Sequence, residues 1–309
     1  MKKTLLALLY ITALIVISIS CSTQKIASST NSNKSLKLVD NQSPKDAIPV
    51  VINDSITNEI LQNKWILYFS DEFNDNKLDN NKWTIENSTK KRVDITLYSD
   101  DTQVEEKDGN ALIYYKKAAE KHDSAYYVGR FNSKGKYATT YGFLEARMKL
   151  VKPNGYQTAF WTMPNAGTSM TNAGPHDGTA ADGAEIDIVE GNRLKTYSYG
   201  LHWDGYAKGT HKGAGGVKPK INDLYDGYHV FGLEWTPIYL RFYFDGKLIK
   251  EMTDPKAIPH VAEFIIFSGS CWGDSEWVDG DVRENELIQK GGTDKAYIDY
   301  VRVYKLKDY

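Results

Sequence analysis

The sequence has few cysteines, and this limits how the chain can be held together. It contains only Cys21 and Cys271 among 309 residues. If an exported chain is processed at Cys21, Cys271 has no partner for an intramolecular disulfide. The folded part must then be stabilised by packing alone, for which about 245 residues are sufficient.

An excess of charge of one sign is also missing. The chain has 38 Lys and Arg residues against 40 Asp and Glu residues, a formal net charge of −2. This balance gives no reason to expect nucleic acid or a strongly acidic polymer as a partner. The six histidines show no H-x-x-x-H or paired ligand spacing, so we expect neither catalytic zinc nor any other cofactor for catalysis.

Long hydrophobic runs are absent except at the N-terminus. Two lysines precede an apolar, uncharged run from Leu5 to Ile19, which is typical of an export signal and short for a membrane span. The cysteine directly after this run looks like a bacterial lipoprotein cleavage site. Residues 1–21 are therefore predicted to be a lipoprotein-type signal peptide with a lipidated Cys21. Ser18 stands where such sites usually carry leucine, which leaves ordinary secretion or an uncleaved anchor open.

The next segment, residues 22–60, is rich in Ser, Asn, Lys and Asp and has no sustained periodicity. Such a composition is typical of a flexible linker. Residues 61–309 are predicted to form one folded domain. We expect a monomer that is exported to the periplasmic or outer face of a membrane and held there through the lipid anchor only, or is otherwise secreted.

Helical periodicity and internal repeats are nearly absent from this domain. Residues 143–150 alternate apolar and mostly polar side chains, as in a half-buried strand. Residues 240–244 alternate similarly and run into Asp245-Gly246, a favoured two-residue hairpin turn. Many short strands with Gly-rich turns predict an all-β fold: a β-sandwich jelly roll of two curved antiparallel sheets, with a concave face that carries a substrate groove.

One of these strands carries three carboxylates. In the segment from Ala184 to Glu190 (AEIDIVE), strict alternation puts Glu185 and Asp187 on one face and the Ala and Ile side chains on the other. A β-bulge at Ile188-Val189 would return Glu190 to the acidic face. Three acids would then share one surface.

Two carboxylates on one surface, one ionised and one protonated, are what retaining glycoside hydrolysis needs. An acid triplet at these offsets can also arise by chance, and a chance triplet usually lies in a polar loop. Here the acids alternate with Ile and Val on a half-buried strand, where unused charges are unfavourable. The flanking residues therefore favour an active site.

At this point the chain resembles glycoside hydrolase family 16, the laminarinase-like endo-β-glycanases, whose strand has the bulged form E-x-D-x-x-E. The resemblance runs from about Leu61 to the C-terminus. The other matching blocks follow the family's order: WILYFSDEF from Trp65, YGFLEARMK from Tyr141, AFWTMP from Ala159, LHW from Leu201, YHVFGLEWTP from Tyr228, YFDG from Tyr243 and IDYVRVY from Ile298.

The resemblance implies that residues 61–309 are a catalytic domain. It implies that Glu185 is the nucleophile, Asp187 the assisting acid and Glu190 the general acid/base. We expect the nearby ionised carboxylates, Asp187 and Glu185, to raise the pKa of Glu190.

Several aromatic and basic residues are candidates for substrate binding, in a chain with 21 Tyr and 7 Trp. Trp161 should offer a flat face for sugar stacking, or else be a core residue. His202 could reach the acids and bind Asp187 or a sugar hydroxyl, or be structural. Arg130 and Arg147 suit sugar hydroxyls or sulfate, although Arg147 could instead pair with Glu145.

A Gly-rich segment, SGSCWGDSEW, adds two further candidates for substrate binding. Its Trp272 and Trp277 would line the leaving-group side or be buried.

A structural calcium is the one metal that the resemblance implies. The family often binds it on the convex face through an acidic residue of the first strand, a Gly carbonyl and an Asp of the last strand. Glu72, Gly109 and Asp299 match in type and order. Asp299 could equally pair with Arg302.

The substrate is expected to be a polysaccharide or oligosaccharide, with β-1,3- or mixed-linkage β-glucan first. Laminarinases usually have Trp-Pro before the A-F-W block, where this chain has Tyr156-Gln157-Thr158. This departure leaves open an endo-β-galactosidase acting on agar, porphyran, keratan or mucin-type glycans. A non-catalytic carbohydrate-binding jelly roll is disfavoured, because it has no use for three adjacent carboxylates. The segments 162–183 and 203–216 read as loops that border the subsites.

Overall fold

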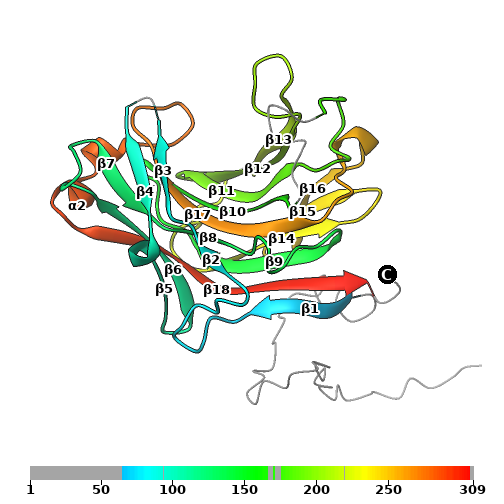
Figure 1. The fold of residues 1–309 in the computed structure, drawn as a ribbon, viewed down its shortest axis with the longest axis horizontal. Coiled ribbons are helices and arrows are strands. Elements are labelled where there is room, and N and C mark those ends of the chain that lie inside the picture. Colours follow the sequence, from blue (N-terminus) through cyan, green and yellow to red (C-terminus); the bar gives the residue numbers. More distant parts are fainter. Residues whose placement is uncertain (1–64, 93, 166–169, 171–174, 219, 307–309) are drawn as a thin grey trace, which may run out of the picture. The chain divides into compact units, whose positions relative to one another are not determined.

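A computed structural model describes residues 65–92, 94–165, 170, 175–218 and 220–306. The predicted signal peptide, Cys21 and the predicted linker lie outside these residues. The described residues form strands in two sheets, which confirms the all-β sandwich (Figure 1). No helix within them is both long and apolar enough to cross a membrane.

The larger sheet has eleven strands. Its order is β16-β15-β14-β9-β18-β6-β7-β4-β3, with β1 paired to β18 and β5 paired to β6. All its pairs are antiparallel except β4 with β7. The strands are β1 (Trp65–Asp71), β3 (Ser88–Lys91), β4 (Thr96–Ser99), β5 (Val104–Lys107), β6 (Asn110–Lys117), β7 (Ala125–Val128), β9 (Gly142–Lys149), β14 (His229–Trp235), β15 (Leu240–Phe244), β16 (Lys247–Met252) and β18 (Thr293–Leu306).

The smaller sheet has seven strands in the order β13-β12-β11-β10-β17-β8-β2, all antiparallel. One of its inner strands carries the acid segment. The strands are β2 (Thr84–Ile85), β8 (Arg130–Asn132), β10 (Tyr156–Pro164), β11 (Glu185–Arg193), β12 (Thr196–Trp203), β13 (Lys212–Lys218) and β17 (Glu263–Cys271).

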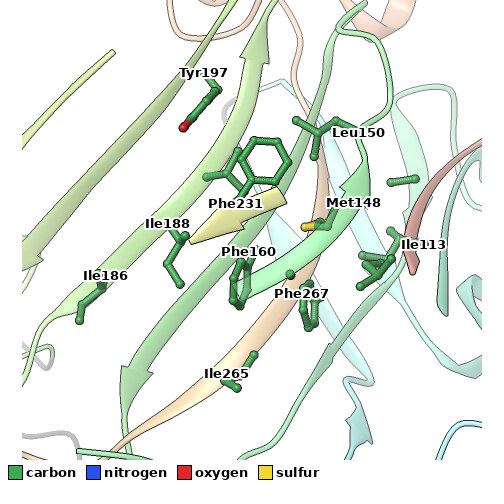
Figure 2. Packing of buried hydrophobic residues seen from close by; sticks show 14 of the residues in the cluster. Ile113, Met148, Leu150, Phe160, Ile186, Ile188, Tyr197, Phe231, Ile265 and Phe267 are labelled. Atoms are coloured by element: carbon green, nitrogen blue, oxygen red, sulfur yellow. The ribbon is translucent and has the colours of Figure 1, made fainter. Parts of the chain in front are cut away.

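The hydrophobic core lies between the two sheets. Figure 2 shows Phe160, Ile186 and Phe267 of the seven-stranded sheet together with Met148 and Phe231 of the eleven-stranded sheet. Phe160 and Phe267 stack with ring centroids 4.9 Å apart. Each strand gives this core every second side chain, so its alternate residues lie on the opposite face of the sheet. We call the face of the seven-stranded sheet that is turned away from the core the site face.

The described residues contain one thiol, and it forms no disulfide. Cys271 is buried at the end of β17. The described domain is therefore held by packing and hydrogen bonds, as its cysteine content predicts.

The predicted hairpin is present between β15 and β16. Asp245 and Gly246 have φ of +46° and +73°, the left-handed pair that matches the twist of a two-residue hairpin. In the part of the chain that the structure describes, helical structure is limited to four short elements: the 3-10 helices η1 (Asp101–Gln103), η2 (Pro255–Ala257) and η3 (Val282–Glu284), and the α-helix α2 (Glu286–Gln289).

Candidate active site

The strand β11 contains the predicted bulge. Trp161 of β10 pairs with Asp187 and Phe160 pairs with Val189, so Ile188 has no partner on β10. On the other edge, Asp187 pairs with Gly200 and Glu190 pairs with Ser198. Two residues of β11 between these pairs therefore lie opposite one residue of β12. The extra residue brings Glu190 to the site face beside the other two acids.

The opposite side of this segment confirms the alternation. Ala184, Ile186, Ile188 and Val189 are all buried in the core. Asp187 is only 3% exposed, and its two acidic neighbours are half-buried. The sequence therefore places three carboxylates together in a desolvated position.

Burial and mutual repulsion raise the pKa of two of these acids most strongly. Burial, followed by repulsion from Glu190 and Glu185, raises the pKa of Asp187 well above its usual range. Burial and then the charge of Glu185 raise the pKa of Glu190 to about 8. Burial also raises the pKa of Glu185, but three neighbours oppose this effect. Of the three acids, Glu185 is therefore the one whose ionised form has a hydrogen-bond donor and two positive charges in its favour.

The cause of the raised Glu190 pKa differs in part from our expectation. We expected ionised Asp187 and Glu185 together to raise the pKa of Glu190. In the structure burial has the largest effect on that pKa, and Glu185 supplies the repulsion.

The three neighbours that favour ionised Glu185 come from different parts of the chain. The hydroxyl of Tyr206 donates a hydrogen bond to Glu185 Oε2. Arg130 of β8 and Lys90 of β3 lower the pKa of Glu185 through their charges. Arg130 is itself paired with Glu86.

Glu190 has a different set of partners. Gln157 of β10 donates from Nε2 to Glu190 Oε1, and Gln157 Oε1 accepts from Trp272 Nε1 at 2.8 Å. The Arg92 guanidinium lies 3.5 Å from the centroid of the Trp272 ring. Trp272 is half-buried, so it reaches the acid group through Gln157, on the side of Glu190.

His202 faces the central acid, as one reading of the sequence predicts. Its Nε2 lies 3.6 Å from Asp187 Oδ2, and its Nδ1 lies 2.9 Å from His211 Nε2. Burial and then His211 lower the pKa of His202, so the ring is neutral at physiological pH. One carboxylate oxygen each of Glu185 and Asp187 and one ring nitrogen of His202 all lie within 4.8 Å of one another.

Trp161 also lies on the site face and is half-buried, which rules out the core reading. Its Nε1 donates to Ser268 Oγ at 3.0 Å. The Arg130 guanidinium lies 4.8 Å from its ring centroid. Trp161 is paired directly with Asp187, so an aromatic side chain stands next to the acids.

Comparison with known families decides what this arrangement is. A family model described as "Beta-porphyranase A-D, GH16 domain" matches residues 64–306. The chain belongs to glycoside hydrolase family 16. This GH16 domain is a glycoside hydrolase, as the bulged acid strand predicts.

Individual relatives agree with this assignment. The β-glucanase of Rhodothermus marinus is 26% identical over 262 residues, which cover 78% of this chain and 85% of the relative. The catalytic domain of an endo-1,3-β-glucanase (laminarinase) from Thermotoga petrophila superposes with a TM-score of 0.62 at 25% identity, over 79% of this chain and 98% of that one. A GH16 enzyme from a Bacteroides ovatus mixed-linkage glucan locus, solved with a product, has a TM-score of 0.60 at 24% identity, over 76% and 99% of the two chains, and shows the shared fold.

Arg147 is not part of the active site of this GH16 domain, which corrects the sequence interpretation. It lies on β9 in the eleven-stranded sheet, on the face opposite Leu144, Ala146 and Met148 of the core. Its Nη1 donates to Asp299 Oδ2 at 2.6 Å, not to Glu145. The structure therefore does not bring Arg147 to the acids.

The residues expected to bind calcium are also arranged differently. Arg302 donates to both carboxylate oxygens of Glu72 at 2.9 and 2.7 Å, and Asp299 is paired with Arg147. Each of the two carboxylates is thus paired with an arginine. Glu72, Gly109 and Asp299 do not fit a calcium site in this structure.

Trp277 lies at the edge of the GH16 site, with a ring that is 39% exposed. Its carbonyl accepts a hydrogen bond from Asn192 Nδ2 of β11 at 3.1 Å. This contact places the backbone of Trp277 beside Asn192, which lies two residues after Glu190 on the strand that carries the acids. A role in sugar binding stays a prediction.

Sequence reasoning missed Gln157 and Tyr206, which contact the acid group, and His211, which contacts His202. Gln157 could have been found, because it lies four residues before Trp161 on one strand and so shares its face. Tyr206 and His211 lie between β12 and β13, where no periodicity predicts the direction of a side chain.

Proposed function

We propose that this chain is a retaining endo-β-glycosidase that cleaves internal bonds of a β-linked polysaccharide. One observation carries the proposal: three carboxylates share the site face of the bulged strand β11. Glu185 is the nucleophile, Glu190 the general acid/base and Asp187 the assisting acid.

The raised pKa of Glu190 suits the two steps of retaining hydrolysis. In the first step Glu190 gives its proton to the leaving oxygen while the carboxylate of Glu185 attacks the anomeric carbon. In the second step Glu190 takes a proton from water, which attacks the covalent intermediate and releases Glu185. The raised pKa of Asp187, between them, disfavours a second negative charge beside the nucleophile.

The first substrate class is β-1,3- or mixed-linkage β-glucan. The Rhodothermus relative is named a β-glucanase and the Thermotoga structure a laminarinase. Both are similar to this chain over more than three quarters of its length. Trp161 beside the acids suits stacking on a sugar ring.

An endo-β-galactosidase acting on porphyran or agar-type chains is the second candidate. The family model that matches residues 64–306 carries the name β-porphyranase. Arg130 of β8 and Lys90 of β3 act on Glu185 through their charges, and cations at this place suit a sulfated sugar. Tyr156-Gln157-Thr158 in place of a Trp-Pro block is consistent with a non-glucan substrate.

A reducing-end assay across laminarin, barley glucan, lichenan, agarose, porphyran and keratan tests the proposal. New reducing ends from laminarin or a mixed-linkage glucan alone support the first class. Cleavage of porphyran or agarose alone replaces it by the second. A folded protein that releases no reducing ends from any of the six would contradict endo-glycosidase activity and favour a binding module.

The stereochemical outcome is a separate prediction. We expect the first-formed product to keep the β configuration, because the carboxyl groups of Glu185 and Glu190 should stand about 5 to 5.5 Å apart, too close for an intervening water. Proton NMR of the fresh product, recorded before mutarotation, measures the anomer. An α anomer at the first time point would make the enzyme inverting and overturn both roles.

The attachment to a membrane is a proposal from sequence alone. Lipid chains on Cys21 would supply the membrane affinity, at about 0.8 kcal/mol per buried CH₂. Wild-type protein should partition into detergent, whereas Cys21→Ser should remain in the aqueous phase or unprocessed. A chain that begins near residue 60 should be monomeric, soluble and fully active on oligosaccharides. Membrane retention of that shortened chain would contradict the proposal.

A further inference from the structure

We propose that Tyr206 is a positioning residue for the nucleophile: its hydroxyl holds Glu185 Oε2 and leaves Oε1 to face the sugar. The proposal rests on the proposed function and adds to it a residue outside the E-x-D-x-x-E strand. It starts from the hydrogen bond between Tyr206 and Glu185.

The segment that carries Tyr206 has a defined backbone. Asp204 and Gly205 have φ of +60° and +71°, a left-handed pair that turns the chain directly after β12. The carboxylate of Asp204 accepts a hydrogen bond from the backbone N–H of Gly178 at 2.9 Å. This bond ties the start of the turn to the segment that precedes β11.

The far end of the segment is closed by a second turn. The backbone N–H groups of Thr210 and His211 donate to the carbonyl of Ala207 at 3.2 and 3.1 Å. Tyr206 therefore lies between two hydrogen-bonded turns. Such a segment loses little conformational freedom when Tyr206 contacts Glu185, because the turns have already fixed its backbone.

The same segment reaches the acid group a second time, through His202. The rings of Tyr206 and His211 are 6.1 Å apart and nearly parallel. The His211 ring stacks on His202 at 5.1 Å, and His202 faces Asp187. One segment thus sets the surroundings of both the nucleophile and the central acid.

Charges face Glu185 from several elements. Arg130 of β8 and Lys90 of β3 favour its ionised form, while Glu86 neutralises part of the charge of Arg130. Neutral His202 of β12 lies beside Asp187.

The two other acids of β11 have raised pKa values, and this favours their neutral forms beside Glu185. Arg130 and Lys90 act on Glu185 through charge, whereas Tyr206 adds a direct hydrogen bond that fixes one oxygen. Orientation of the attacking oxygen is a large part of catalysis by a bound nucleophile.

Tyr206→Phe is the variant that tests this role, because it removes only the hydroxyl of a side chain that is 54% exposed. Tyr114→Phe is the matched control. Tyr114 donates in the same way to a glutamate, Glu105 Oε2, at 2.6 Å, but it lies on β6 of the other sheet. Both variants should melt at the wild-type temperature.

The first measurement needs no substrate. Protein labelled with ¹³C at the glutamate side-chain carboxyl is titrated by NMR, and the Glu185 signal is assigned by its loss in Glu185→Gln. We expect the titration midpoint of Glu185 to rise by about one pH unit in Tyr206→Phe and to stay in place in Tyr114→Phe. A midpoint that does not move in Tyr206→Phe would overturn the proposal.

The second measurement is the pH dependence of kcat and of kcat/KM on laminarin or porphyran, whichever the wild type cleaves. The nucleophile must be ionised, so a higher pKa should move the acidic limb of both profiles upward in Tyr206→Phe. At pH values on that limb kcat should fall by about tenfold. A rise in KM alone, with the limb in place, would make Tyr206 a substrate contact only.

The two proposals can fail separately. If the wild type cleaves no glycan but the Glu185 midpoint still moves in Tyr206→Phe, the proposed function fails, while the hold of the Tyr206 hydroxyl on Glu185 stands. If the wild type is active and neither the midpoint nor the acidic limb moves, the role of Tyr206 fails alone.

Discussion

Glu185→Gln is expected to lower kcat on the polysaccharide by roughly 10⁴-fold or more, the size of effect seen when a nucleophile is removed. The amide keeps the shape of the side chain and can still accept the Tyr206 hydroxyl, but it cannot form the covalent intermediate. Folding should be intact, because the change removes a partly buried charge without opening a cavity.

Reducing-end release and thermal melting measure this prediction together. Glu105→Gln is the control, since Glu105 accepts a tyrosine hydroxyl on the other sheet and should keep wild-type activity. Retention of more than about 1% of the wild-type rate by well-folded Glu185→Gln, beyond trace contamination by wild-type enzyme, would remove Glu185 from the role of nucleophile.

The strand that carries the acids could be predicted because its residues obey one simple rule. Period-two alternation separates Ile186 and Ile188 from Glu185 and Asp187, and only an inserted residue lets Glu190 join them. The same rule predicted the strand β9. This rule determines on which face of a strand each side chain lies, and the register of β10 against β11 agrees with it.

Alternation does not say which sheet a strand joins. Arg147 was correctly placed opposite the core side of β9, but β9 belongs to the eleven-stranded sheet. Its non-core face is therefore not the site face. The partner of Arg147 is Asp299, 152 residues away, and only tertiary structure brings the two together.

Glycine-rich sequence concealed one strand. Residues 203–216 were expected to form a loop, yet β13 begins at Lys212 and pairs with β12. Its glycines are required by close approach, because a Cβ at Gly215 would stand 2.5 Å from the carbonyl oxygen of Tyr199, and one at Gly216 would stand 2.7 Å from the Tyr199 hydroxyl. Low β propensity is overridden here by the packing of β12.

Glu190→Gln is expected to separate substrates by their leaving groups. On the natural polysaccharide kcat should fall by about 10²- to 10⁴-fold, because no acid protonates the departing oxygen. On an activated aryl β-glycoside, such as the dinitrophenyl derivative, the first step needs little acid help and should stay fast. The second step still lacks its base, so the covalent Glu185 intermediate should accumulate and be visible by mass spectrometry.

The pH profile gives an independent check on the same residue. Burial and the charge of Glu185 raise the pKa of Glu190 to about 8, so the wild-type acid is protonated below that pH and loses its proton above it. Wild-type activity on the polysaccharide should therefore fall as the pH rises through about 8. In Glu190→Gln the burst of aryl release should lack this basic limb. Equal losses on both substrates, or a basic limb that survives the substitution, would assign the general acid to another group.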